Sequence, residues 1–379
     1  MLKEREAARG QKIPLLGGVA PQGRGGPRQS NFELLRILLM LMIVSVHMVG
    51  YGGLLGHAET PLSGRVLLVL LSSGGKVGVN GFVMLSGYFL CTSKSLFQSK
   101  RLLKLWLQIF FYSAGLFFGL YFAGLCRMHP DDAFHFLLPV TQNIYWFASV
   151  FFLLMLAAPF LNRLLQSLDR KSYRALLLVV FLAFSLMPTF LRVRYEVPRL
   201  CWFFYLYLLA GYIRLHPEPI FDKKWPTLAV AVGSYLVSAF YAPLHSNLLP
   251  YIPLLRHMPE RWHTPGTSVP ALLCSLALFI FFKNVNIKGS RVINLIASGT
   301  FGVYLLHEHG IRMRRLIWLE LFDGRPITGS TAALLGHALL AIFAVFAVGV
   351  VIDLIRQYAL ERPLFLALDK TKLGKKYLQ

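Results

Sequence analysis

Long apolar runs, rather than short amphipathic repeats, dominate this sequence. Runs of about 20 apolar residues recur along the chain, and a helix of that length crosses a hydrocarbon core of about 30 Å. Lipid offers the backbone no hydrogen-bond partners, so each such run must be helical. The pattern therefore predicts an all-α, polytopic transmembrane helical bundle of about ten spans, at residues 32–52, 66–90, 102–125, 144–161, 174–191, 200–216, 226–243, 268–283, 291–310 and 332–355.

The overall composition agrees with this pattern. Of 379 residues, 56% are hydrophobic and only 15% are charged, and the mean hydropathy is +0.57. In a typical soluble domain about a quarter of the residues are charged, so this composition argues against a soluble globular fold. We expect one membrane domain over residues 32–366, between a basic, disordered cytoplasmic tail at 1–31 and a basic cytoplasmic tail at 367–379.

The formal net charge of +22 comes from basic residues clustered between the apolar runs. With the N-terminus inside, about two thirds of the lysines and arginines fall on the cytoplasmic side, as the positive-inside rule requires. This predicts an even number of spans, both termini in the cytoplasm, and a multi-pass protein of the cell (cytoplasmic) membrane that contacts lipid headgroups. Nucleic-acid binding needs a basic face on a soluble fold, so no nucleic-acid partner is expected.

Two predicted outer loops break the charge rule. One contains Arg192, Arg194 and Arg199, and the other contains Arg312, Arg314 and Arg315. These residues either extend their charges to the membrane interface or bind an anionic ligand on the outer side, because charges at a membrane are costly.

Arg36 and His47 form a polar pair within the first span. Eleven helical positions bring the two side chains to within about 20° of one another around the axis and about 16 Å apart along it. Arginine suits phosphate binding, and imidazole acts as a general base near neutral pH. The alternative is that Arg36 only reaches the interface and His47 bonds a neighbouring helix.

Further polar residues are expected at the depth of His47. Tyr304, His307 and Glu308 end the ninth span, and a carboxylate there would orient an imidazole and stabilise its protonated form. Trp146 opens the fourth span at the same level, either as a substrate contact or as an interfacial aromatic residue. In the second span, Asn80 and Ser86 can hydrogen-bond across a helix interface.

A basic segment, Lys100-Arg101-Leu102-Leu103-Lys104, opens the third span on the cytoplasmic side. Arg101 and Lys104 are three residues apart and share a helix face. They bind an anionic cytosolic ligand or serve only to orient the chain. The four cysteines have no metal-ligand spacing, so no metal site is predicted.

Taken in order, these motifs resemble the acyltransferase-3 family of membrane-bound O-acyltransferases. The family signature is a basic residue, ten residues and then histidine in the first span, as in Arg36 to His47. The resemblance covers residues 31–366. The other similar segments are Phe82 to Tyr88, the basic pair Arg101 and Lys104, Tyr145-Trp146-Phe147 with Pro159 to Asn162, Tyr207 to Arg214, and Thr300 to His307.

The resemblance implies transfer of an acyl group, with acetyl as the expected case, from acyl-CoA to a hydroxyl of a cell-surface or lipid-linked glycan. His47 would be the general base or acyl relay, Arg36 would contact the donor, and Arg101 and Lys104 would hold its phosphates. The family has arginine where this chain has Lys104, and lysine lacks the bidentate geometry of arginine.

The candidate site thus comprises eight residues in three roles. The candidate catalytic residues are His47, Glu308 and His307, the donor-binding residues are Arg36, Arg101 and Lys104, and the substrate-binding residues are Trp146 and Tyr304. Acyl-CoA is the expected donor, and no metal is expected. Two other functions compete: a transporter or flippase for a lipid-linked glycan, for which no matching halves are visible, and a non-catalytic scaffold.

Overall fold

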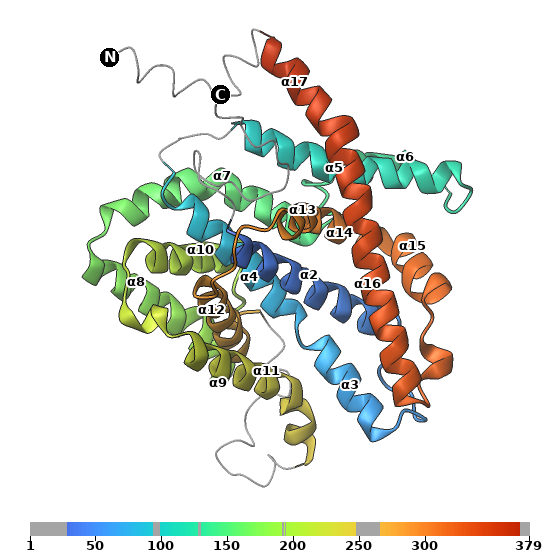
Figure 1. The fold of residues 1–379 in the computed structure, drawn as a ribbon, viewed down its shortest axis with the longest axis horizontal. Coiled ribbons are helices and arrows are strands. Elements are labelled where there is room, and N and C mark those ends of the chain that lie inside the picture. The colour runs from blue at the N-terminus through green and yellow to red at the C-terminus, as the bar shows by residue number, and fades with distance from the viewer. Residues whose placement is uncertain are drawn as a thin grey trace.

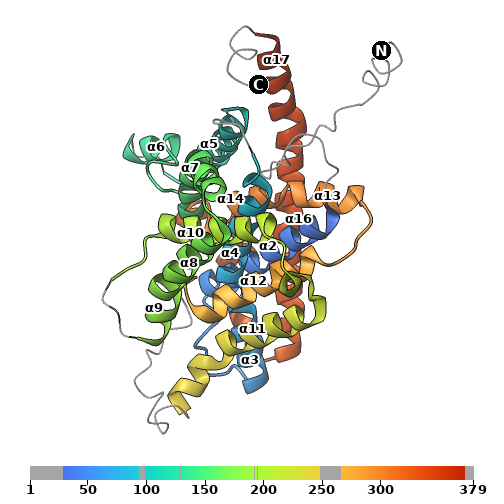
Figure 2. The same ribbon diagram turned by 90° about the vertical axis from the view of Figure 1, so that its left-hand side faces the viewer.

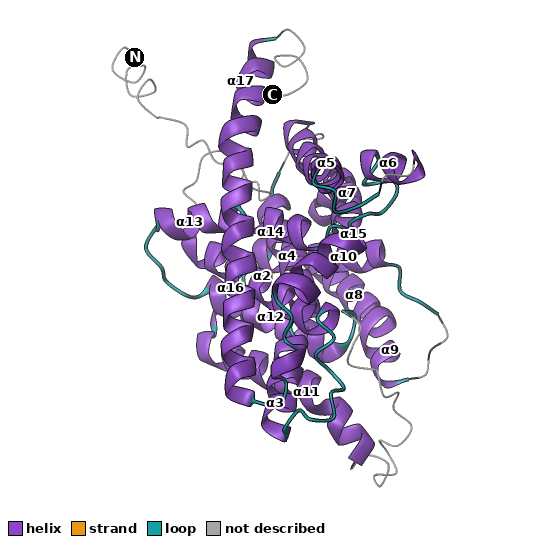
Figure 3. Ribbon diagram, turned by 90° about the vertical axis from the view of Figure 1, so that its right-hand side faces the viewer, coloured by secondary structure: helices purple, strands orange, loops and turns teal. Residues whose placement is uncertain are grey.

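A computed structural model of the protein describes residues 29–93, 99–127, 130–191, 193, 195–247 and 266–371. All regular elements within these residues are helices, which confirms the predicted all-α class (Figure 3). Residues 1–28 and 372–379, most of the two predicted tails, lie outside the described residues.

Six helical stretches are long and apolar enough to cross a membrane. They are Ser30–Tyr51 (α2), Leu62–Leu90 (α3 and α4), Ser99–Phe122 (α5), Trp146–Ser167 (α7), Arg170–Phe190 (α8 and α9) and Thr331–Lys370 (α16 and α17). The other predicted spans also fall on helices: α10 (Arg199–Leu215), α11 (Lys224–Asn247), the shorter apolar α12 (Val269–Lys283), and the pair α13 (Arg291–Ser298) and α14 (Thr300–His307). The protein is a polytopic helical membrane protein, and the count of ten spans and the sides of the termini stay predictions.

Several of these stretches are interrupted rather than continuous. A turn at Ser73 and Gly74 separates α3 (Leu62–Ser72) from α4 (Gly75–Leu90), and Gly299 separates α13 from α14. The long C-terminal helix instead changes pitch in a π-helical turn at Gln357–Glu361, between α16 (Thr331–Arg356) and α17 (Arg362–Lys370). In Figure 2 the α17 end of this helix projects beyond the other helices.

Helix α2 lies at the centre of the bundle (Figure 1). It packs against α3, α4, α12, α13, α14 and α16, so most of its faces meet protein rather than lipid. Its buried side chains include Leu35, Leu39 and Val44, each without exposed surface. The polar side chains of α2 therefore point into a helix-lined interior.

Polar side chains join the helices around this centre. The Asn80 amide of α4 donates to the Gly266 carbonyl at 2.8 Å and accepts from the Trp202 indole of α10 at 3.0 Å. Ser86 instead donates to the Phe82 carbonyl of its own helix. Among the residues that the structure describes, Asn80 thus bonds to a second helix and Ser86 does not.

Helices α4 and α10 approach each other closely at Gly87. A Cβ atom on Gly87 would lie 2.6 Å from the carbonyl oxygen of Tyr207 and 2.8 Å from its Cα. Both neighbours are backbone atoms and cannot move aside as a side-chain end can. Glycine is therefore required by the helix–helix contact.

We expect Gly87→Ala to destabilise the protein by about 1–3 kcal/mol, because the added methyl group must push two helices apart. The matched control is Gly115→Ala on α5, where a Cβ would meet nothing within 4 Å and alanine favours the helix by about 1 kcal/mol. Thermal unfolding of the purified protein in detergent measures both. Equal melting temperatures for the two variants would contradict the close approach.

Candidate active site

His47 of α2 contacts the C-terminal end of α14. Its Nδ1 lies 2.9 Å from Nε2 of His307 and 3.1 Å from Oε1 of Glu308. The Nδ1 of His307 is 2.6 Å from the Val303 carbonyl, which can only accept, so that nitrogen carries the proton. His307 Nε2 is therefore an acceptor, and the proton of His47 lies on Nδ1. The Nε2 of His47 is left with a free lone pair, as a general base requires.

Glu308 is held at this site by two further side chains. Arg314 places a guanidinium nitrogen 2.7 Å from Oε2, and the Tyr51 hydroxyl donates to the same oxygen at 3.3 Å. The Glu308 side chain is 3% exposed, whereas that of His47 is 19% exposed. The carboxylate is thus buried and paired with arginine, and its other oxygen faces the imidazole that would become charged.

His47 lines a cavity of about 330 Å³. Lys76, Trp146 and Tyr304 also line it, so the structure brings both predicted substrate-binding residues to the cavity of the predicted base. The Tyr304 hydroxyl is buried and has no hydrogen-bond partner among the described residues. A bound substrate could therefore accept its proton.

Arg36 lines a smaller neighbouring cavity of about 20 Å³, together with Ser86 and Thr300. Arg36 is 6% exposed, and its guanidinium lies 2.6 Å from the carboxylate of Glu33. Three aromatic rings line both cavities: Phe82, Phe147 and Phe301. They lie between the space beside His47 and the space beside Arg36.

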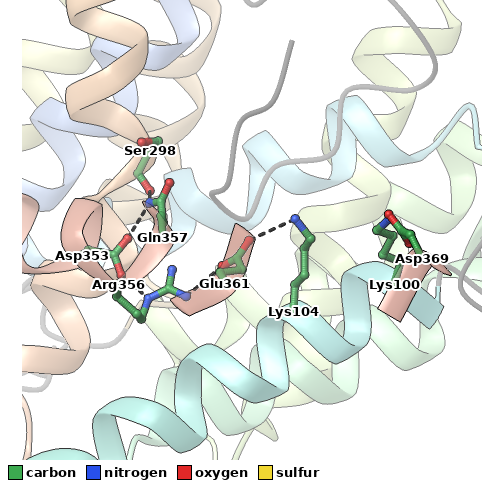
Figure 4. Close-up of polar contacts among 8 residues, drawn as sticks. All are labelled: Lys100, Lys104, Ser298, Asp353, Arg356, Gln357, Glu361 and Asp369. Carbon is green, nitrogen blue, oxygen red and sulfur yellow. Dashed lines mark hydrogen bonds and ion pairs between the residues drawn. The ribbon is translucent and has the colours of Figure 1, made fainter. Parts of the chain in front are cut away.

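The predicted phosphate-binding Lys104 belongs to a network of charges at one end of α5 (Figure 4). Its ammonium lies 3.0 Å from Glu361, which also accepts from Arg356 at 2.8 Å. Arg356 donates to Asp353 at 2.8 Å. The half-buried Arg101 lies one turn before Lys104 on the same helix. Lys104 would have to leave or share Glu361 in order to bind a phosphate.

Asp353 is the fully buried centre of this network, with no exposed surface. Besides Arg356, three side chains donate to its carboxylate: Gln108 at 3.0 Å, Tyr112 at 3.1 Å and Gln357 at 2.7 Å. A Cβ on Gly302 of α14 would clash with the Cβ of Asp353, so glycine lets α14 pack against this residue. The network ties α5, α14 and the long C-terminal helix together.

His47, His307 and Glu308 are also the three described residues whose potential metal-ligand atoms cluster within 4.8 Å. Two imidazole nitrogens on one tetrahedral zinc, each about 2.0–2.1 Å from the metal, would be about 3.4 Å apart. The nitrogens of His47 and His307 are 2.9 Å apart, which is a hydrogen-bond distance. The Arg314 cation beside Glu308 further disfavours a metal ion.

Three residues of the site were not assigned to it from the sequence: Arg314, Tyr51 and Lys76. Arg314 stood out only as part of an outer basic cluster, and Arg312 of that cluster is paired with Glu320. Tyr51 lies four residues after His47, one helical turn away, and its ring stacks on the imidazole at 5.2 Å. That spacing was the available signal for Tyr51.

The comparisons with known proteins give the class and the family of the chain. A family model described as an acyltransferase domain, Acyl_transf_3, matches residues 29–354. The protein is a membrane acyltransferase, and it belongs to the acyltransferase-3 family, which confirms the resemblance. No curated protein and no solved structure matches the chain.

We expect Asp353→Ala to destabilise the protein by about 3–5 kcal/mol, because it removes the carboxylate that holds Arg356 and three further donors in the interior. Asp369→Ala is the control. It likewise removes an acidic side chain with a basic partner, Lys100 at 2.7 Å, but this pair is exposed and is worth at most about 1 kcal/mol. Thermal unfolding in detergent would show a large drop only for the first variant, and equal drops would contradict the central role of Asp353.

We also expect chelation with EDTA to leave acyl transfer unchanged, because a hydrogen bond joins the two histidines where a zinc site would separate them. The measurement is transfer by purified protein before and after EDTA treatment and dialysis. A loss of activity that added zinc restores would show instead that His47, His307 and Glu308 are metal ligands.

Proposed function

We propose that this protein transfers an acyl group, with acetyl as the expected case, from acyl-CoA to a hydroxyl of a cell-surface or lipid-linked glycan. The observation that carries the proposal is the His47–Glu308 contact of 3.1 Å at the edge of a cavity, in a chain of this family. A histidine with a buried carboxylate behind it is an arrangement suited to removing a proton from a hydroxyl group.

In the proposed reaction, His47 Nε2 takes the proton of the acceptor hydroxyl as its oxygen attacks the thioester carbonyl. The new ester C–O bond forms, the C–S bond breaks, and the departing CoA thiolate receives the proton from the imidazolium. Glu308, at 3.1 Å from Nδ1, stabilises the imidazolium while it exists. His307 Nε2 accepts a hydrogen bond from the Nδ1 proton of His47, and this leaves Nε2 of His47 free to act as the base.

The donor is proposed to enter from the side of Arg36 and α5. CoA carries several phosphates, which suit the basic residues Arg36, Arg101 and Lys104. A thioester arm lying past the rings of Phe82, Phe147 and Phe301 would reach the cavity of His47, because the two cavities share those rings. The acceptor then occupies the larger cavity, beside Trp146 and Tyr304.

We expect His47→Ala to lower the transfer rate by about 10²–10⁴-fold, because the base is lost. Glu308→Gln keeps the shape of the side chain but removes its charge, and a fall of similar size in kcat is expected because the imidazolium loses its counter-charge. His135→Ala, at an exposed position on α6 (Pro130–Leu137), is the control and should be active.

The assay offers radiolabelled acetyl-CoA to membranes that contain each variant and follows the label into lipid-linked or polymeric saccharide. A wild-type protein that moves glycan across vesicles without incorporating label would support a transporter instead. Full activity of His47→Ala would exclude His47 as the base.

A further inference from the structure

Two cations lie over one indole ring that lines the larger cavity. Lys76 places its ammonium 5.3 Å from the Trp146 ring centre, and the Arg199 guanidinium carbon lies 4.9 Å from the same centre. Lys76 and Trp146 both line the cavity of His47. Lys76 and Arg199 are both exposed residues.

Neither cation has an acidic partner within the described part of the chain. The other basic residues around the two cavities differ in this respect, since Arg36 is paired with Glu33 and Arg314 with Glu308. Two like charges beside one ring repel each other, and such charges at a membrane are seldom idle. The pair therefore has the features of a site that an anion completes.

The position of the pair separates it from the donor-binding residues. Lys76 is at the start of α4, and Ser86, which lines the cavity of Arg36, is ten residues further along the same helix. Ten residues of helix span about 15 Å. The two cations thus lie at the end of α4 away from Arg36, on the acceptor side of the proposed reaction.

Lys76 and Arg199 also stand at helix starts. Arg199 is the first residue of α10 and Lys76 the second residue of α4. The positive ends of both helix dipoles add to the two side-chain charges. Arginine can bind a carboxylate or phosphate through two parallel hydrogen bonds, and lysine adds a point charge.

We propose that the acceptor is an acidic saccharide, whose carboxylate or phosphate is bound between Lys76 and Arg199 while the sugar ring contacts the edge of the Trp146 indole. The role of the saccharide as acyl acceptor rests on the proposed function, but the anion site itself is inferred from the contacts of Lys76, Arg199 and Trp146. The bound charge fixes the sugar so that a neighbouring hydroxyl faces His47, which lines the same cavity.

The test measures binding, without catalysis, to the full-length protein in nanodiscs of phosphatidylcholine. The probes are methyl β-D-glucuronide, glucose 1-phosphate and the neutral methyl β-D-glucoside, and saturation-transfer NMR gives their dissociation constants. We expect at least one charged sugar to bind wild type about tenfold more tightly than the glucoside, as a charge-assisted contact implies.

The variants Lys76→Gln and Arg199→Gln should each reduce this preference to about twofold or less, because each removes one charge and keeps a polar side chain. The matched control is Lys171→Gln, at an exposed lysine on α8 (Arg170–Phe181), and it should keep the full preference. Far-ultraviolet circular dichroism and melting temperature confirm that the variants are folded.

Three results would overturn the inference: equal binding of charged and neutral sugars, a preference that survives in both variants, or a preference lost when phosphatidylglycerol is added to the nanodiscs. The last would assign the cations to a lipid headgroup. Acyl transfer is measured separately, by comparing the wild-type protein with the His47→Ala variant. Charge-selective binding without any acyl transfer would refute the proposed function alone, and acyl transfer without charge selectivity would refute this inference alone.

Discussion

Pairing of buried charges is the interaction on which the rest of this structure depends. A charged group among membrane-spanning helices is tolerated when an opposite charge and further hydrogen bonds surround it. Asp353 satisfies this requirement through four side chains from α5 and the C-terminal helix, and it thereby fixes how those helices pack. The same requirement places Arg314 on Glu308, which in turn positions the carboxylate beside His47.

The presence or absence of such a pair also distinguishes charges with a structural role from charges that are available to a ligand. Arg314 and Arg356 each have a carboxylate within the protein, so their charges are already used in the resting structure. Arg36 is also paired, with Glu33, and would have to be shared between that partner and a donor phosphate. Lys76 and Arg199 instead lie over the Trp146 ring, and neither has an acidic partner among the described residues. Lys104 is intermediate, because its partner Glu361 is shared with Arg356 and could be exchanged for a phosphate.

The interrupted helices are what bring this chemistry together. The break at Gly299 lets α14 run as a separate short helix against α2, α5 and α16, with His307 and Glu308 at its end. The break at Ser73 and Gly74 begins α4 just before Lys76, which gives that lysine a helix start at the cavity. A continuous span would satisfy its backbone equally well in lipid but would not place a helix end there.

The sequence by itself determined the helical membrane class and the family, and it predicted that His47, Trp146, Tyr304 and Glu308 would lie at one level. Apolar run length and the 3.6-residue repeat are local properties, so they can be read directly from the chain. The partners of several polar residues were decided only by the tertiary structure: Glu361 for Lys104, and Asp353 for Gln108 and Tyr112. Contacts between distant segments depend on how helices turn and tilt against each other, which is set by packing across the bundle and has no signature in a single span.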